Sequence, residues 1–328
     1  MPHQVAVITG AGAGIGRATA RTLARAGCDV ALIGRDSDRL EAAAAELAEL
    51  HVRAMAVTAD VADAAALDRA AESIESRLGP ITLWVNCAGA DVCGQFVTLP
   101  PADIRRATEV TYLGTVHGTQ AALTRMRRRG CGTIVNLAAL SLPLPLRAVE
   151  SGARAAIRAF TESLRPEILR DGDRIHLALV HLPAINTPRF SWTRNHTGKR
   201  LKPTAPVYEP EIAAEAISRA AFGRHRDVRV GLSGLGRRAA GLLVPSLMDR
   251  RQSLHAYARQ LEKDAAEADA PDNLFAPVTG AYAAHGRFDL DVRKTMPILV
   301  TTTIRSVLAG AALAAGLGVL AAAIRRRA

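Results

Sequence analysis

The chain has 328 residues, of which 49% are hydrophobic, so it is long and apolar enough to form a large packed core and is not a disordered or fibrous chain. The 42 Lys and Arg residues outnumber the 31 Asp and Glu residues, which gives a net charge of +11. Much of this excess lies in the last third, where it either attracts nucleic acid or an anionic membrane surface or only keeps the surface solvated.

Up to about residue 232, short β-rich runs alternate with longer Ala-rich helical patterns, which is typical of repeated βα units. The predicted strands are 4–9, 29–33, 52–58, 81–86, 132–137, 174–181 and 228–231, and the predicted helices are 15–26, 36–50, 63–78, 102–129, 149–170 and 210–222. The sequence therefore predicts an α/β fold with a doubly wound parallel sheet and helices on both faces. A ligand is expected at the carboxyl ends of the strands.

Beyond the sixth strand the pattern changes. Several prolines interrupt 183–209, which is predicted to be an irregular lid over the ligand cleft. Segment 236–269 is predicted to form one or two amphipathic helices, and 270–292 a loop. We therefore divide the chain into a domain at 1–232 that includes the lid, a helical and loop extension at 233–295, and an apolar tail at 296–328.

Within the tail, residues 306–324 carry no charge and are flanked by Arg305 and by the three arginines 325–327. As a helix this stretch would be about 28 Å long, close to the thickness of a bilayer core. Ala and Gly dominate it, so the drive for insertion is weak. Three alternatives stay open: a membrane anchor, a helix packed on the protein or in a dimer, and a disordered tail.

The four cysteines, Cys28, Cys87, Cys93 and Cys131, form no CxxC pair and no cluster with histidine at metal-ligand spacing. We expect no metal site and a reducing compartment. The amino terminus lacks the basic and apolar regions of a secretory signal, which favours a cytoplasmic location. The basic segments lack interleaved aromatic residues or a recognisable motif, so no nucleic-acid partner is expected.

The glycine-rich turn Thr9-Gly10-Ala11-Gly12-Ala13-Gly14-Ile15-Gly16 directly follows the first predicted strand. Its glycines let the backbone approach a pyrophosphate held at the amino terminus of the next helix. Asp60-Val61 follows the third strand, and Asn86-Cys87-Ala88-Gly89 follows the fourth. With these three motifs in register, residues 4–232 resemble the short-chain dehydrogenase/reductase family, which implies a Rossmann-type fold and an NAD(P)-dependent oxidoreductase activity.

The resemblance implies that the three motif glycines pack against the pyrophosphate, that Asp60 and Val61 border the adenine, and that 86–89 stabilises the central strand and borders a ribose. The second strand ends at Arg35, where a family member that prefers NAD usually has an acidic residue. Arg35 offers a cation to a 2′-phosphate, so NADP is predicted in preference to NAD; the alternative for Arg35 is a surface residue at the start of a helix. The residues expected to bind the cofactor are Thr9, Gly10, Gly14, Ile15, Gly16, Arg35, Asp60, Val61, Asn86, Ala88, Gly89, Arg154, Pro183 and Thr187.

Residues 182–192 resemble the family's segment over the nicotinamide, in which Thr187 is expected to hydrogen-bond the carboxamide. Together with 206–211, this segment is most similar to a bacterial subgroup with a longer C-terminal region. The family also implies a homo-oligomer formed through the fourth and fifth helices.

The family's catalysis requires a tyrosine, a lysine four residues later, an upstream serine and a supporting asparagine. In this sequence Glu150 occupies the tyrosine position and Arg154 the lysine position. Thr111 occupies the asparagine position. Residues 137–139, Leu-Ala-Ala, occupy the serine position, and the nearest hydroxyl belongs to Ser141.

These replacements change the chemistry. A free glutamate titrates near ~4.3 against ~10 for tyrosine, so Glu150 should be an anion with no proton to donate, and arginine does not relay protons. Glu at i and Arg at i+4 favour a helical ion pair, and we predict that Glu150 and Arg154 form a fixed bridge. The sequence therefore predicts an NADP-binding family member that lacks the ordinary catalysis and acts as a binding or regulatory subunit with an unidentified small-molecule or protein partner. Two alternatives remain: an active oxidoreductase of altered mechanism, and an isomerase or dehydratase that uses Glu150 as a base.

Overall fold

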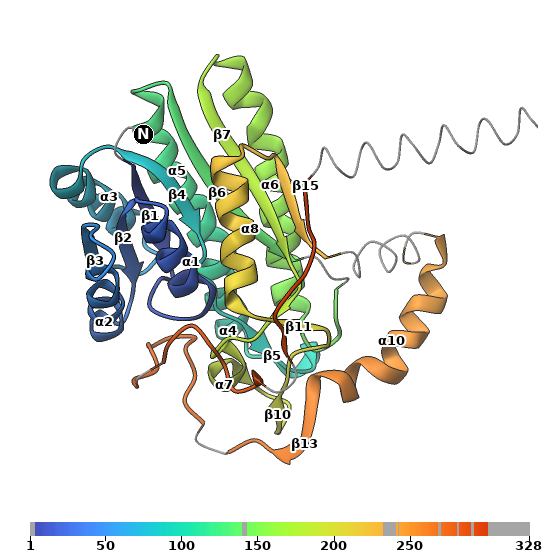
Figure 1. The fold of residues 1–328 in the computed structure, drawn as a ribbon. Coiled ribbons are helices and arrows are strands. Elements are labelled where there is room, and N and C mark those ends of the chain that lie inside the picture. Colours follow the sequence, from blue (N-terminus) through green and yellow to red (C-terminus); the bar gives the residue numbers. More distant parts are fainter. Residues whose placement is uncertain are drawn as a thin grey trace, which may run out of the picture.

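The computed structural model describes residues 4–139, 143–231, 241, 243–267, 270–280, 282–289 and 292–300. Its centre is an eight-stranded sheet in the order β15-β12-β7-β6-β4-β1-β2-β3 (Figure 1). Neighbouring strands are parallel except β12 and β15, which are antiparallel. The strands are β1 (Val5–Thr9), β2 (Asp29–Gly34), β3 (Ala54–Thr58), β4 (Ile81–Asn86), β6 (Cys131–Ala139), β7 (Arg174–Leu182), β12 (Asp227–Val230) and β15 (Ile298–Val300).

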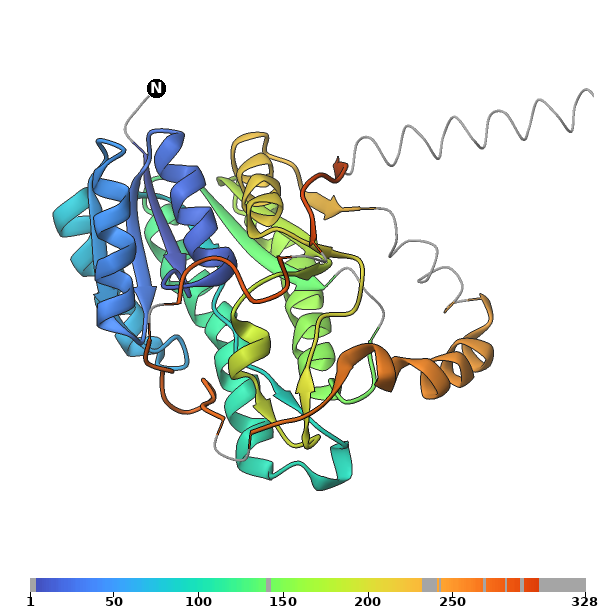
Figure 2. The same ribbon diagram turned by 60° about the horizontal axis from the view of Figure 1, so that its bottom comes forward.

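Helices cover both faces of the sheet, which confirms the predicted doubly wound architecture (Figures 1 and 2). Leucines and isoleucines of α1 (Gly14–Arg25), α2 (Ser37–Ala48) and α8 (Pro210–Phe222) pack into one core. Side chains of α3 (Ala64–Leu78), α5 (Gly114–Arg127) and α6 (Ala148–Arg170) belong to the core on the other face. Because both faces are covered, every residue of β1 is buried, as expected for a central parallel strand.

The predicted strands and helices up to residue 230 are all present, with ends within two residues of the prediction. Local chemistry explains several of these ends. The Asp36 carboxylate accepts a hydrogen bond from Arg39 N (2.9 Å) at the start of α2, and Asp63 accepts one from Ala66 N (3.0 Å) at the start of α3. The predicted helix 102–129 is interrupted, because α4 (Pro101–Thr108) continues into a π-helical turn, η2 (Glu109–Leu113), before α5.

The lid contains short elements rather than only irregular backbone: β8 (Ala184–Ile185), α7 (Arg189–Trp192), β9 (Arg194–Asn195), β10 (Lys199–Leu201) and β11 (Val207–Tyr208). β9 pairs with β5 (Val92–Cys93), which follows β4. Two strands lie where other structure was predicted. β13 (Leu261–Ala265) follows α10 (Pro245–Gln260) and pairs with β10, and β15 lies within the segment assigned to the apolar tail. Both depend on a partner distant in sequence, which local pattern does not reveal.

Residues 270–280 and 282–289, here called the strap, run across the carboxyl ends of the strands (Figure 2). The strap is not a solvated loop, because Leu274 and Ala284 are each 0% exposed. It leads to β14 (Val292–Arg293), which pairs with β11.

Among the described residues, no helix combines the length and hydropathy needed to cross a membrane. The predicted apolar helix at 306–324 lies outside the described residues.

Candidate nucleotide and catalytic site

The glycine-rich turn forms a narrow backbone cradle between β1 and α1. Gly10 and Gly14 have positive φ angles of 67° and 58°, and a Cβ on Gly16 would lie 2.2 Å from the Gly10 carbonyl oxygen. No side chain caps the amino terminus of α1, and its first turn contains no acidic residue. The positive end of this helix is therefore free of side-chain acceptors, which suits a phosphate.

A cleft of about 220 Å³ lies beside this cradle. Most of the residues predicted for the cofactor and the catalytic positions line it, namely Gly10, Gly14, Ile15, Gly16, Arg35, Asp60, Val61, Ala88, Gly89, Thr111, Glu150, Arg154 and Thr187. Three predicted residues lie elsewhere. Thr9 and Asn86 are buried in the sheet, and Pro183 lines a second cavity.

Thr9 and Asn86 shape the cleft from behind. Thr9 Oγ1 accepts hydrogen bonds from Cys87 N and Ala88 N, each 3.1 Å, which fixes the loop after β4. The Asn86 amide donates to Asn136 Oδ1 on β6 (2.8 Å), which ties the two central strands together. Both side chains therefore position the site without reaching the cleft.

Arg35, predicted to bind a 2′-phosphate, contacts the strap. Its guanidinium donates to the carbonyl oxygens of Asn273, Leu274 (3.3 Å) and Phe275 (3.1 Å). Burial lowers the pKa of Arg35, while the nearby Asp60 carboxylate opposes this change. Arg35 is therefore not a free surface residue.

Asp60 is held by its own partners. Its carboxylate accepts hydrogen bonds from Ala62 N (3.0 Å) and from Arg106, which also donates to the Leu274 carbonyl oxygen (3.1 Å). Burial raises the pKa of Asp60, but the hydrogen bonds from the Ala62 amide and from Arg106 lower it by more, so the net shift is downward.

The strap also reaches the glycine turn. Gly14 N donates to the Ala283 carbonyl oxygen (3.0 Å), and Arg17 Nη1 donates to the Tyr282 carbonyl oxygen (2.9 Å). At the start of α8, His285 Nε2 lies 3.1 Å from Glu211 Oε2. Pockets for small molecules usually measure ~300–1,000 Å³, so the 220 Å³ cleft is small for a dinucleotide while these contacts hold.

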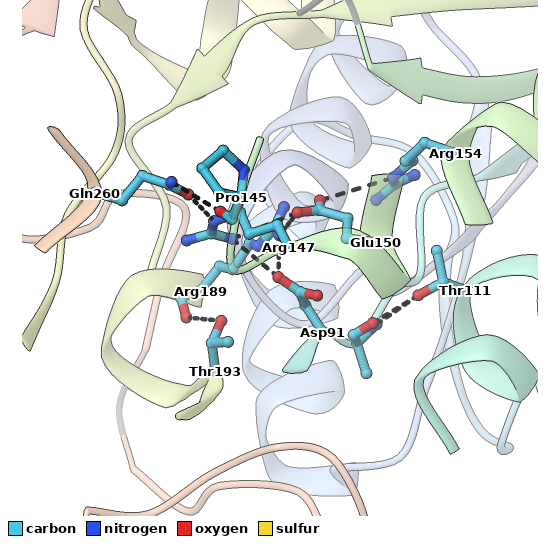
Figure 3. Close-up of polar contacts among 10 residues, drawn as sticks. Asp91, Thr111, Pro145, Arg147, Glu150, Arg154, Arg189, Thr193 and Gln260 are labelled. Carbon is cyan, nitrogen blue, oxygen red and sulfur yellow. Dashed lines mark hydrogen bonds and ion pairs between the residues drawn. The ribbon is translucent and has the colours of Figure 1, made fainter. Parts of the chain in front are cut away.

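Glu150 and Arg154, which were predicted to occupy the family's catalytic positions, lie in an ion cluster with Asp91, Arg147 and Arg189 (Figure 3). Glu150 Oε2 lies 2.5 Å from Arg189 Nη2 and 3.4 Å from Arg147 Nη1, whereas Glu150 Oε1 lies 4.0 Å from Arg154 Nε. The pair predicted between Glu150 and Arg154 is therefore present only as the longest of three contacts. The shortest contact comes from the lid.

Asp91 completes the cluster and is 4% exposed. Its Oδ2 lies 2.9 Å from Arg147 Nη1 and 2.8 Å from Arg189 Nη2. Arg147 Nε donates to Gln260 Oε1 (3.1 Å), so the cluster also fastens the end of α10. The cluster therefore joins four parts of the chain: the loop after β4, the lid, α6 and the C-terminal end of α10.

The electrostatics of the cluster fix Glu150 as an anion. Burial alone raises the pKa of Glu150, but Arg189 and Arg147 outweigh burial and hold it well below its usual range. Burial and the Glu150 carboxylate raise the pKa of Asp91 to about 6, against the opposing arginines. A proton taken up by this pair at mildly acidic pH therefore goes to Asp91 rather than Glu150.

Arg154 and Thr111, two of the residues predicted at catalytic positions, are held by hydrogen bonds to the backbone. Arg154 Nη1 donates to the Leu137 carbonyl oxygen (3.2 Å), at the position where the family's serine is expected; Ser141 lies outside the described residues. Thr111 Oγ1 donates to Ala90 O (2.7 Å) and accepts from Ala90 N (3.1 Å), so its hydrogen is already used. All four tyrosines are described, and none lines either cavity.

Sequence reasoning missed Arg147 and Arg189 as partners of Glu150, it missed Asp91 as the second carboxylate that these arginines bind, and it missed the strap. Arg189 follows the Thr187-Pro188 pair that the family resemblance had already placed over the nicotinamide, which was the available signal. Asp91 lies two residues after the end of the Asn86–Gly89 motif. Nothing in the local pattern of 270–289 indicated that it folds over the cleft.

A doubly wound sheet with a glycine-rich turn at the amino terminus of α1 defines a nucleotide-binding type of α/β protein. The family model described as short chain dehydrogenase matches residues 4–197, more than half of the chain. The chain belongs to the short-chain dehydrogenase family, which confirms the resemblance drawn from its motifs.

Individual relatives agree with this assignment. An uncharacterised oxidoreductase, YxnA of Bacillus subtilis, is 31% identical over 264 residues, 79% of this chain and 74% of that protein. A 3-ketodihydrosphingosine reductase of Bos taurus is 25% identical over 71% of this chain and 73% of its own length.

Solved structures are similar as well. An alcohol dehydrogenase of Thermococcus sibiricus complexed with 5-hydroxy-NADP matches with a TM-score of 0.56 and 29% identity, over 66% of this chain and 88% of that one. The L-sorbose reductase of Gluconobacter frateurii, complexed with NADPH and L-sorbose, matches with a TM-score of 0.60 and 26% identity, over 68% and 90%.

Proposed function

We propose that this protein binds NADP(H), lacks the family's ordinary Ser-Tyr-Lys proton transfer, and acts as a binding or regulatory subunit. One observation carries the proposal. At the tyrosine position stands Glu150, an anion surrounded by Arg147, Arg154 and Arg189. A group with no proton at neutral pH cannot protonate the alkoxide that forms when a hydride reaches a carbonyl.

The residues around the cleft fit the cofactor. The Gly10–Gly16 cradle and the uncapped amino terminus of α1 would hold the pyrophosphate, and Arg35 would bind the 2′-phosphate in preference to the hydroxyl of NAD. Arg154 and Thr187 would contact the nicotinamide half. The cofactor supplies a hydride when bound. Two of the similar solved structures were complexed with NADPH or 5-hydroxy-NADP, which favours the same choice here.

The strap makes cofactor binding conditional. The Gly14 amide and the Arg35 guanidinium, both needed for the phosphates, already hydrogen-bond strap carbonyl oxygens. A dinucleotide in this cleft therefore has to displace the strap. Such coupling between nucleotide binding and a C-terminal segment suits a regulatory protein better than a fast enzyme.

Two other functions, an active oxidoreductase and an isomerase or dehydratase, fit the residues of the cleft less well. Oxidoreductase names among the relatives favour an active enzyme of altered mechanism, but neither Glu150 nor Arg154, which occupy the predicted tyrosine and lysine positions, is suited to donate a proton at neutral pH. An isomerase or dehydratase would use Glu150 as a base. The lowered pKa of Glu150, caused by Arg189 and Arg147 against the effect of burial, makes it a weak one.

Oxidation of NADPH, followed at 340 nm in the full-length protein over a broad panel of aldehydes and ketones, tests the proposal. We expect rates at the level of the protein-free control, together with saturable NADPH binding in calorimetry. A carbonyl substrate turned over by the wild type, at a rate that Glu150→Gln reduces, would overturn the regulatory role. If NADPH did not bind, the proposed cofactor role would be overturned and only the assignment of the fold would remain.

Arg35→Ala tests the choice of cofactor. Loss of a charged hydrogen bond to the 2′-phosphate is worth roughly 1.5 kcal/mol, so the ratio of NADPH to NADH affinity should fall about tenfold. The ratio is the useful quantity, because the substitution also loosens the strap and affects both nucleotides alike. An unchanged ratio in paired calorimetric titrations would assign Arg35 to the strap alone.

Other expectations remain predictions. A homo-oligomer through α5 and α6 is tested by light scattering on the purified protein, and a cytoplasmic location with membrane contact through 306–324 by fractionation of cells.

A further inference from the structure

A second cavity of about 580 Å³ lies between the start of α6, the lid and α10. It adjoins the nucleotide cleft, because Ile15, Glu150, Arg154, Thr187 and Arg189 line both. α10 extends away from the sheet (Figure 1), and one of its sides closes this cavity through Met248, Arg251, Gln252, His255, Ala256 and Arg259.

Much of the cavity wall is apolar. The ends of β6 and β7, the loop before α6, the lid and α10 contribute Leu137, Leu144, Leu182, Ile185, Phe190 and Met248. A cavity of this size and lining excludes a small polar anion as the natural occupant, because apolar surface would stay in contact with water.

The charge of the lining is strongly one-sided. Seven Lys and Arg residues line the cavity, and Glu150 is the one carboxylate among them. Arg147, Arg154 and Arg189 already surround Glu150. The other four are Arg158, Lys202, Arg251 and Arg259, and within the described ranges none of them has an acidic partner.

Four cations without counter-charges around an apolar cavity repel one another and favour an anion between them. The apolar wall adds a second requirement, since burial of methylene groups against it is favourable. A ligand that satisfies both has an anionic head and an alkyl chain.

We propose that this cavity binds an anionic amphiphile, a long-chain carboxylate or alkyl phosphate, with its head near Arg251 and Arg259 and its chain against Leu144 and Phe190. The proposal deepens the proposed function by naming the class of small molecule that the regulatory subunit would bind. A bound amphiphile would also contact Arg189, which links the cavity to the ion cluster and to the nucleotide cleft.

Calorimetry on the full-length protein tests this with ten-carbon ligands below their micelle concentrations. Decanoate and decyl phosphate should bind at least tenfold more tightly than decyltrimethylammonium, which has the same chain and the opposite charge, and more tightly than acetate, which lacks the chain. The tighter of the two anions identifies the head group. Equal binding of the cationic amphiphile would overturn the proposal.

The double variant Arg251→Ala and Arg259→Ala should weaken binding of the anion by about tenfold or more, since charged hydrogen bonds of roughly 1.5 kcal/mol are lost. Arg250→Ala is the matched control, because Arg250 is exposed on the same helix and does not line the cavity. Equal weakening by both variants would mean general attraction to a basic surface and would overturn the assignment.

An NADPH titration of the same samples separates this proposal from the function on which it rests. Binding of decanoate without NADPH binding would overturn the proposed function and leave the amphiphile site standing. NADPH binding without decanoate or decyl phosphate binding would overturn the amphiphile site and leave NADPH binding, on which the proposed function depends, standing.

Discussion

Glu150→Gln should lower the free energy of unfolding by about 2–3 kcal/mol, because it leaves the buried Arg147 and the partly buried Arg189 with one carboxylate fewer. Arg189 and Arg147 lie 2.5 Å and 3.4 Å from the Glu150 carboxylate. Both arginines keep Asp91 as a second partner, so the loss should be smaller than for an isolated buried pair. Urea denaturation at neutral pH measures the change.

Glu215→Gln is the control, since Glu215 and Arg219 form an i,i+4 pair with both side chains about half exposed. Its loss should be below about 0.5 kcal/mol. A comparable loss in both variants would contradict the assignment of Glu150 to a structural cluster.

The pH dependence adds a second readout. The folded-state pKa of Glu150 lies below its ordinary value of ~4.3, because Arg189 and Arg147 overcome the effect of burial. Its contribution to stability is therefore complete above that value and is lost as the pH falls through the folded pKa. The difference between wild type and Glu150→Gln should shrink below about pH 4. If the stability difference between wild type and Glu150→Gln grew as the pH fell, the pKa of Glu150 would be higher in the folded than in the unfolded protein, and the assignment would be wrong.

The same residue illustrates what the sequence could predict. Continuous apolar runs such as Val5–Ile8 and the helical spacing between them locate the strands and helices, because each signal depends on neighbours within a few residues. The motif spacing predicts which residues border the cleft. The sequence alone also predicts that Glu150 occupies the position where the family has its tyrosine.

The partners of Glu150 could not be predicted in the same way. Arg189 lies 39 positions along the chain from Glu150. Asp91, which shares Arg147 and Arg189 with Glu150, lies 59 positions away, and only the folded lid and sheet bring these groups together. Helical spacing favoured Arg154, whose contact with Glu150 is the longest, because an arginine from the lid can approach the carboxylate more closely than one on the same helix. Strand β15 and the strap depend on similar long-range contacts.

Leu274→Ala should strengthen NADPH binding by about tenfold or more. Leu274 is 0% exposed and belongs to the core that includes side chains of α3, α5 and α6, and truncation of such a leucine costs about 2–5 kcal/mol. If the strap opens without unfolding the sheet, that loss raises the fraction of molecules with an open cleft, and the apparent affinity rises in proportion. The carbonyl oxygen that holds Arg35 and Arg106 is retained in the variant, so only the side-chain packing changes.

Phe275→Ala is the matched control, because the Phe275 side chain is 52% exposed and the Phe275 backbone makes the same kind of contact with Arg35 as that of Leu274. We expect unchanged NADPH affinity in this variant. Calorimetry gives the affinities, and limited proteolysis without nucleotide reports whether the strap opens more often in Leu274→Ala. Weaker NADPH binding in Leu274→Ala would mean that Leu274 forms a wall of the bound-nucleotide site. The strap would then be part of the cofactor site and would not compete with the nucleotide.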